Sequence, residues 1–268
     1  MKNSEVKKKK RWPKVLLVIL LIIGAIAGFI CYNSSKNMKV MNRTLDAGME
    51  TISEYAKLTP VDAGEYKQIK MYGLLKFDVE QYDVEDIGNL SVMKVNMGFM
   101  QMVSYIITPY KKNMPMLSMD FMYILGKRKA YAEFYDLVPD VSSPEYVGVI
   151  QSIKKFEDSY SDLEDIRPDP AWYDEYLTVV LHKAAKRDND ERVEKMFTDA
   201  IRCYMETAKE LDTLSDEDKA KKLAITQEYC DNLVEKGGVS TDVFKKQLGK
   251  DKTKDFFDKV LFGTEQYR

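Results

Sequence analysis

An uncharged apolar run near the N-terminus, "VLLVILLIIGAIAGFICY" at residues 15–32, places the strongest constraint on this chain. As a helix, a run of this length rises about 27 Å, close to the thickness of the hydrocarbon core of a bilayer. We therefore predict a transmembrane signal-anchor at 15–32. Residues 1–14 carry six lysines and one arginine against Glu5 alone. The positive-inside rule then predicts a basic cytoplasmic tail, and a single-pass protein whose folded domain is extracytoplasmic.

A cleaved signal peptide is the alternative interpretation, because "AIA" at 25–27 has the small residues of a cleavage site. Phe29 and Ile30 extend the apolar run past that site, which favours retention of the segment. Both interpretations place the folded part of the chain at or beyond the membrane. Apolar residues then recur at helical spacing until Pro60, which predicts a juxtamembrane helix or linker at 33–60 and a domain at 61–268.

The composition excludes some classes of protein. Forty-one basic and 43 acidic side chains give no strong field for nucleic acid, so none is expected as a partner. Cys203 and Cys230 allow one disulfide without requiring it, and no cysteine or histidine spacing indicates a metal site. His182 is the only histidine, and we expect it to be a structural residue on a helix. No glycine-rich phosphate loop is present, and we predict no metal and no tightly bound cofactor.

The first half of the domain has the pattern of an antiparallel sheet. Between residues 66 and 137, short segments rich in β-branched, aromatic and methionine residues are separated by Gly, Pro or Asn. They are "YKQIKMYGLLKF", "SVMKVNMGFM", "MVSYIIT", "FMYIL" and "KAYAEFYDL". These segments predict about five strands in a meander, with a tight turn at "GKRK", residues 126–129.

After residue 140 the pattern becomes helical. Ser143 and Pro144 predict the start of one helix, and a long apolar stripe predicts another from Asn189 to Leu211. Ser215 opens a helix that ends at Gly237, and two shorter helices follow. The predicted fold class is α+β, an antiparallel sheet sandwiched between helices and preceded by one transmembrane helix.

Asp120 is the most informative single residue. If "MPMLSMDFMYIL" is a strand, Ser118, Asp120, Met122 and Ile124 share one face. A carboxylate among covered residues needs a partner or a raised pKa, and such groups occur often in clefts. Asp120 is therefore either a working acid in a pocket or a polar residue outside the covered part of the sheet. The nearby methionines likewise fit an apolar pocket or simple core packing.

Two blocks of sequence resemble the ferredoxin-dependent bilin reductases, which share their fold with red chlorophyll catabolite reductase. "MVSYIITPYKKNMPMLSMDFMYILGKRKAYAEFYDLVPD", 102–140, is similar to the family's succession of a strand, a proline, an aspartate strand and a "DLSP"-like segment. "TQEYCDNLVEKGGVSTDVFKKQLGKDKTKDFFDKVLF", 226–262, resembles its C-terminal helices.

The resemblance implies that a linear tetrapyrrole lies between the sheet and the C-terminal helices. It implies that Asp120 is the catalytic proton donor and that an external one-electron donor supplies the electrons. Its ligand contacts would include Ser104, Ser118, Met122, Tyr229 and Lys236. A ferredoxin-like donor is expected only if the domain is cytoplasmic.

The chain also departs from the family pattern. Ser104 stands where many members have a histidine, and the expected glutamate falls near Lys94 or Asn96. An Asn-Asp pair found in some members falls on Lys236 and Gly237. Two functions follow as hypotheses: a membrane-anchored reductase of linear tetrapyrroles, or a non-enzymatic surface domain that binds a hydrophobic ligand or a partner protein. A scaffold at the cell envelope is a third.

Overall fold

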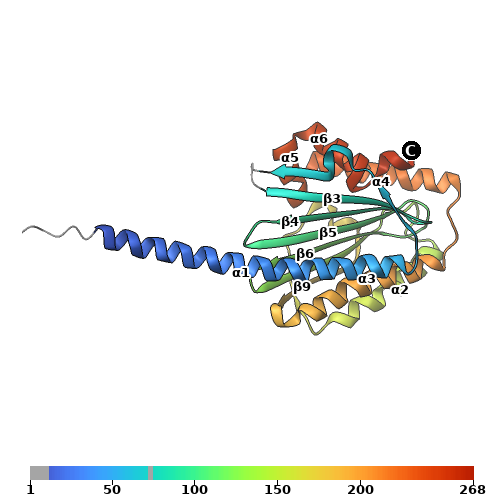
Figure 1. Cartoon of the computed structure of the whole chain (residues 1–268). Helices are drawn as coiled ribbons and strands as arrows, with labels where there is room; N and C mark the ends of the chain where they lie inside the picture. The colour runs from blue at the N-terminus through green and yellow to red at the C-terminus, as the bar shows by residue number, and fades with distance from the viewer. Residues whose placement is uncertain (1–11, 72–74) are drawn as a thin grey trace, which may run out of the picture.

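The computed structural model describes residues 12–71 and 75–268 as an antiparallel sheet between two layers of helices (Figure 1). The helices are α1 Trp12–Ser53, α2 Pro144–Glu157, α3 Asp190–Lys209, α4 Asp216–Lys236, α5 Val239–Leu248 and α6 Lys250–Phe256, which a π-helical segment, Phe257–Leu261, continues. The strands are β1 Leu58–Val61, β2 Gln68–Met71, β3 Leu75–Val84, β4 Gly88–Asn96, β5 Met100–Pro109, β6 Met116–Ile124, β7 Lys127–Tyr135, β8 Glu164–Asp165 and β9 Leu177–Lys186. Within the described residues the sheet order is β1-β3-β4-β5-β6-β7-β9-β8, with β2 paired to β3. The predicted α+β fold is confirmed.

Helix α1 runs without a break from the apolar segment into the domain. It is 42 residues long, and its apolar first half is exposed. By length and composition it is one helix that could cross a membrane. The helix ends at Ser53, earlier than the end near Pro60 that the sequence indicated. Of the predicted basic tail, residues 1–11 lie outside the described part of the chain.

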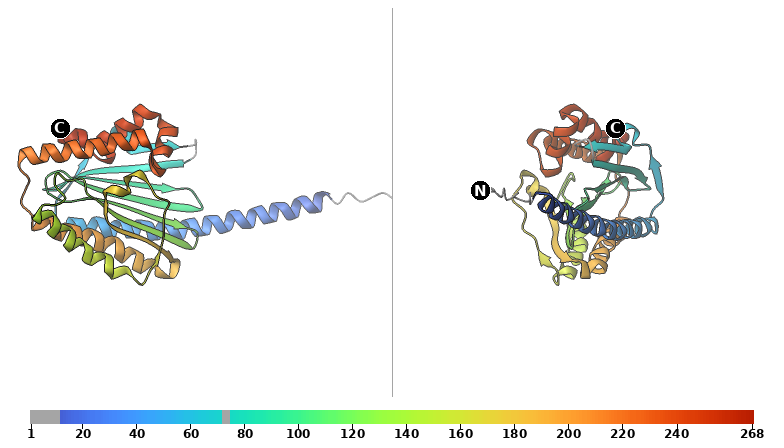
Figure 2. Two further views of the ribbon diagram at one scale, coloured as in Figure 1. Left: turned by 180° about the vertical axis from the view of Figure 1, so that it is seen from behind. Right: turned by 60° about the vertical axis from the view of Figure 1, so that its left-hand side comes forward.

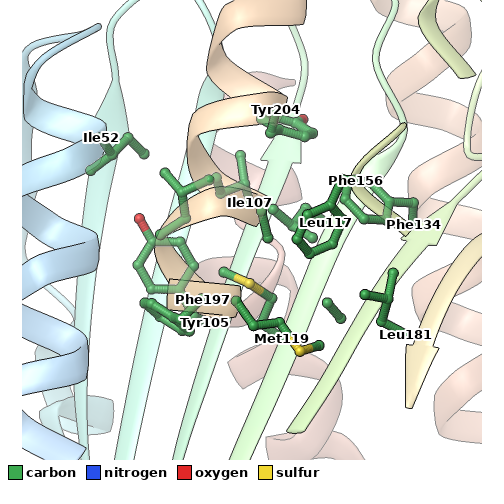
Figure 3. Packing of buried hydrophobic residues seen from close by; sticks show 14 of the residues in the cluster. Ile52, Tyr105, Ile107, Leu117, Met119, Phe134, Phe156, Leu181, Phe197 and Tyr204 are labelled. Carbon is green, nitrogen blue, oxygen red and sulfur yellow. The ribbon is translucent and has the colours of Figure 1, made fainter. Parts of the chain in front are cut away.

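The second half of α1 belongs to the core of the domain. Met41, Leu45 and Ile52 are buried in one cluster with the side chains of the sheet and of α2 and α3. Figure 3 shows Ile52 at the edge of this cluster, with Tyr105 packed against Phe197. Asn37 is also buried, and its Nδ2 donates to the carbonyl of Tyr123 at 3.2 Å. The apolar segment and the domain are therefore joined by continuous helix rather than by a flexible linker.

The two faces of the sheet are covered by different helices. α1, α2 and α3 cover one face, and α4, α5 and α6 cover the other (Figure 2). The side chains of strand β6 point alternately to the two helical layers. Leu117 and Met119 are fully buried on the face that packs against α1, α2 and α3. Ser118 and Asp120 alternate with them and face the C-terminal helices, as their strand parity predicted.

The strand β9 corrects the expectation that only helices follow residue 140. Its residues alternate between a buried face, with Val179 and Leu181, and a partly exposed face. β9 pairs antiparallel with β7, and His182 therefore lies on a strand and not on a helix. The hairpin between β6 and β7 turns at Leu125 and Gly126 and not across the predicted residues 126–129, because Ile124 pairs with Lys127 and β7 begins there.

The predicted starts of α2 and α4 and the predicted end of α4 agree with the structure. The side chain of Ser143 accepts from the backbone N–H of Tyr146, and that of Ser215 accepts from Asp218. Gly237 ends α4 with a φ of 82°, a conformation that favours glycine. Cys203 on α3 and Cys230 on α4 are free, and they lie on opposite sides of the sheet.

Candidate functional site

A cavity of about 340 Å³ lies between the sheet and the C-terminal helices. Its floor is formed by residues of strands β4 to β7 and β9, and its roof by Tyr229, Leu233, Phe244, Phe257 and Phe262. Exposed lining residues, among them Asp169 and Val239, mark where it opens to solvent. The volume is in the range typical of sites for small molecules.

Four polar side chains form a row across the floor of this cavity. Ser104 of β5 pairs in register with Asp120 of β6, Asp120 with Tyr131 of β7, and Tyr131 with His182 of β9. Directly paired residues of antiparallel strands point to the same face of the sheet. All four residues line the cavity. We call this set the polar row.

Asp120 keeps part of its surface open to the cavity but is otherwise enclosed by protein. This burial raises the pKa of Asp120 to about 6, against an opposing hydrogen bond from Ser104 and with a smaller contribution from the negative charge of Glu133. A carboxyl group with such a pKa is available in both protonation states near neutral pH, which is what a general acid requires.

Glu133 of β7 lies at the centre of a second polar group. Its Oε1 is 2.6 Å from Nε2 of His182, and its Oε2 accepts from the hydroxyl of Tyr135 at 2.6 Å. Tyr135 also forms a side-chain hydrogen bond with Tyr229 of α4, and burial raises the pKa of both tyrosines well above the usual value. This chain of contacts runs from the floor of the cavity to its roof.

The rest of the lining is largely apolar. Met93, Met102, Met116 and Met122 lie on the floor, opposite the aromatic rings of the roof. Other methionines, such as Met119, are packed in the opposite core. Some of the methionines therefore line an apolar pocket and others fill the core, so each of the two interpretations given above applies to a different set of residues. Soft, flexible side chains of this kind adapt to an apolar ligand.

The charge of the lining is one-sided. Asp120, Glu133, Asp169 and Asp174 line the cavity, and the lining residues that the structure describes include no lysine or arginine. His182 is the one lining residue among them that can carry a positive charge. The cavity is therefore suited to groups that donate N–H hydrogen bonds and not to carboxylates.

The structure brings most of the predicted site residues together. Asp120, Ser104, Ser118, Met122 and Tyr229 all line the cavity.

Lys236, the remaining predicted contact, lies elsewhere. It is the last residue of α4, exposed, with its ammonium 4.6 Å from the centre of the Trp172 ring. Lys94, at the position of the expected glutamate, forms an ion pair with Glu80 at 3.0 Å. Neither is among the described residues that line the cavity.

Sequence reasoning missed Tyr131, Glu133 and His182. The strand parity of "KAYAEFYDL" puts Tyr131 and Glu133 on one face, but the segment contains no signal that this face is the one lining a cavity. For His182 a signal existed: "LTVVLHKAA" is a short segment rich in β-branched and apolar residues, in which Thr178, Val180 and His182 are spaced two apart, as on one face of a strand. Within the described parts of the chain, no group of three His, Cys, Asp or Glu residues could hold a metal ion.

The fold and the cavity define a class of protein, an α+β domain that can hold a small molecule between an antiparallel sheet and its C-terminal helices. The sequence profile of the ferredoxin-dependent bilin reductases matches residues 56–263, and the chain belongs to this family. The predicted resemblance is thus confirmed.

A solved structure, phytochromobilin synthase from tomato in complex with biliverdin, has a similar fold, with a TM-score of 0.69 at 14% sequence identity. The similarity covers 85% of this chain and 84% of that chain. No protein of curated function matches the chain in sequence.

Proposed function

We propose that this protein is a membrane-anchored reductase of a linear tetrapyrrole, with Asp120 as a proton donor to the bound pigment. The observation that carries the proposal is the position of Asp120, a carboxyl group with a pKa of about 6 on the floor of a cavity large enough for a small molecule. Ser104 hydrogen-bonds this carboxyl group, which holds it in place beside the ligand. Membership of the bilin reductase family supports the choice of ligand.

The reaction needs two electrons and two protons for each double bond that is reduced. An external one-electron donor protein supplies the electrons in two steps, and acids in the cavity supply protons to the reduced pigment. Asp120 gives one proton and is then reprotonated from solvent. The pyrrole N–H groups of the ligand match the acidic lining, and its carboxylate side chains would point out through the opening near Asp169.

The proposed anchor is the apolar half of α1, residues 15–32. The basic residues before it favour a cytoplasmic N-terminus, which would place the domain outside and away from a cytoplasmic ferredoxin. Protease treatment of intact cells tests this arrangement. If the domain is digested in intact cells, it lies outside the membrane and needs an extracytoplasmic electron donor. If it is digested only after lysis, it lies in the cytoplasm, where ferredoxin can reach it.

The full chain in detergent micelles, mixed with biliverdin, tests the function. Binding is expected to shift the absorbance of the pigment, and ferredoxin with its reductase is expected to convert it to a reduced bilin. Asp120→Asn should bind the pigment and reduce it at least about 100-fold more slowly, the lower end of the effect of a general acid. The matched control is Asp136→Asn, since Asp136 also has a raised pKa from burial but bonds to Tyr146 away from the cavity. The absence of any absorbance shift would refute the ligand class.

A second function is favoured by Ser104 and by the methionine-rich floor of the cavity: binding of a hydrophobic ligand without reduction. Ser104 has no acidic proton to give at neutral pH, unlike the histidine expected there. The same experiment separates the two functions. Pigment bound equally well by the original protein and by Asp120→Asn, without reduction by any donor, would support the non-enzymatic alternative.

A further inference from the structure

We propose that His182, oriented by Glu133, is a second proton donor to the pigment bound in the cavity. The inference rests on the proposed reductase function and extends it to a residue of β9. Reduction of one double bond consumes two protons, and Asp120 can give only one before it is recharged. The chain has Ser104 where a histidine was expected, so a second acid that gives its proton without waiting for Asp120 to be reprotonated would come from another part of the fold.

The sheet places His182 on the same face as Asp120. Both belong to the polar row, with Tyr131 between them. Because neighbouring strands lie about 4.8 Å apart, two strand spacings separate the backbones of Asp120 and His182 by roughly 10 Å. The ring of Tyr131 meets the imidazole edge to face, with centroids 5.0 Å apart. A linear tetrapyrrole is longer than this separation, so one molecule can reach both acids.

Glu133 holds the imidazole ring in place. Its Oε1 is 2.6 Å from Nε2 of His182, while its Oε2 is held by Tyr135 at the same distance. The side chains of His182 and Glu133 are 10% and 17% exposed, so water competes little for this contact. The described residues offer no hydrogen-bond partner to Nδ1. One ring nitrogen is thus fixed and the other remains available to a ligand, as in carboxylate–histidine pairs that position a proton donor.

The charges around the ring are compatible with proton donation. When His182 is an imidazolium, the negative charge of Glu133 compensates it inside the enclosed site. The imidazolium gives its Nδ1 proton to the pigment and becomes neutral, and the pigment keeps the two electrons from the external donor. The other titratable groups that line the cavity are Asp120, Asp169, Asp174, Tyr131, Tyr135, Tyr173 and Tyr229. Asp169 is exposed at the opening of the cavity, through which protons from solvent can reprotonate His182.

His182→Gln and Glu133→Gln, in the full chain in detergent micelles, test the inference. Both variants are expected to bind biliverdin within about 2-fold of the original affinity, because neither removes an apolar contact. Reduction is expected to slow by about 100-fold in His182→Gln and less in Glu133→Gln, whose amide oxygen can still accept from the ring. Added imidazole should restore part of the rate of His182→Ala, an effect that a purely structural role would not produce. Lys186→Gln, at the exposed end of the same strand, is the control and should keep the original rate.

A second measurement does not depend on turnover. His182 is the only histidine in the chain, so the protein with a histidine-free tag gives a single imidazole signal in NMR spectra. This signal is expected to move when biliverdin is added, and its position in Glu133→Gln should differ because the contact with the carboxylate is replaced. If His182→Gln does not fold, this signal and Glu133→Gln decide the question.

The outcomes distinguish the inference from the function on which it rests. Reduction by His182→Gln at the original rate, or an imidazole signal that biliverdin leaves unchanged, would overturn the role of His182 and leave Asp120 as the proton donor. An original protein that binds no bilin would overturn both proposals. Binding without reduction by any donor would refute proton donation by either residue.

Discussion

Gly48 of α1 lies directly against the ring of Phe197 on α3. A Cβ atom at Gly48 would come within 2.2 Å of Cε1 of Phe197. The absence of a side chain at this position lets the two helices approach closely enough to bury Met41, Leu45 and Ile52 around it. The helix that is proposed to cross the membrane is, through this contact, also a structural part of the domain.

Truncation at two points should separate these two roles of α1. A chain that begins at Asn33 lacks the apolar span and keeps the packed half of the helix, so we expect a folded protein that needs no detergent. A chain that begins at Ala56, where the family match starts, loses the three buried apolar side chains of α1, whose burial is worth about 5–8 kcal/mol together. This is comparable to the whole stability of many domains. Circular dichroism and urea unfolding check both chains, and cooperative unfolding of the shorter one would contradict the prediction.

Substitution of Gly48 by alanine should destabilise the domain. In an exposed helix the change from glycine to alanine stabilises by about 1 kcal/mol. At Gly48 the added methyl group collides with Phe197, and we expect a loss of about 1–3 kcal/mol from overpacking. Gly148 of α2 is the matched control, because a Cβ there meets nothing within 4 Å. Urea unfolding of the chain that begins at Asn33 should therefore give opposite signs for the two variants.

Asp120 should lower the stability of the protein at neutral pH. Burial raises its pKa from an ordinary 3.8 to about 6, so between these values the folded state binds more protons than the unfolded state. Stability therefore falls as the pH rises from 4 to 6, and the cost is fully present above pH 6. Asp120→Asn removes this cost, with a gain of up to about 3 kcal/mol at pH 7.5 that disappears below pH 4.

Urea unfolding at several pH values checks this prediction. Asp62→Asn is the control, because the backbone N–H of Gly64 and the ammonium of Lys67 lower the pKa of that exposed carboxyl group. It should produce no gain at neutral pH. Equal stability of Asp120→Asn and the original protein at pH 7.5 would show that burial of the charged Asp120 carboxylate does not destabilise the folded state.

The acidic lining predicts that the carboxylates of the ligand do not strengthen its binding. Because the described lining has acids and no lysine or arginine, biliverdin dimethyl ester should bind at least as tightly as biliverdin. Titrations followed by absorbance compare the two pigments. An ester bound more than 10-fold more weakly would indicate a cation near the opening, and Lys236 beside Trp172 is the one cation among the predicted contacts. In that case Lys236→Gln should weaken the binding of biliverdin and leave that of the ester unchanged.

Local sequence patterns predicted the elements whose signals are contained within one segment. The apolar run at 15–32, the capping residues Ser143 and Ser215 and the strand parity of Asp120 each depend on neighbouring residues alone. The strand β9 was missed because a short amphipathic segment between two helices, α2 and α3, carries little information about its partner strand. Its pairing with β7, about 50 residues earlier, is what makes it a strand.

The sequence by itself determined the apolar helix, the α+β class, the family and the candidate acid Asp120. It could do so because hydrophobic period, capping and motif order are properties of adjacent residues. Only the tertiary structure decided that His182 and Glu133 line the same cavity as Asp120 and that Lys236 is not among its lining residues. That arrangement depends on the register of β6, β7 and β9, in which residues 120, 131 and 182 become neighbours across the sheet. Pairing over such distances along the chain is set by packing of the whole sheet between its helices, which no single segment encodes.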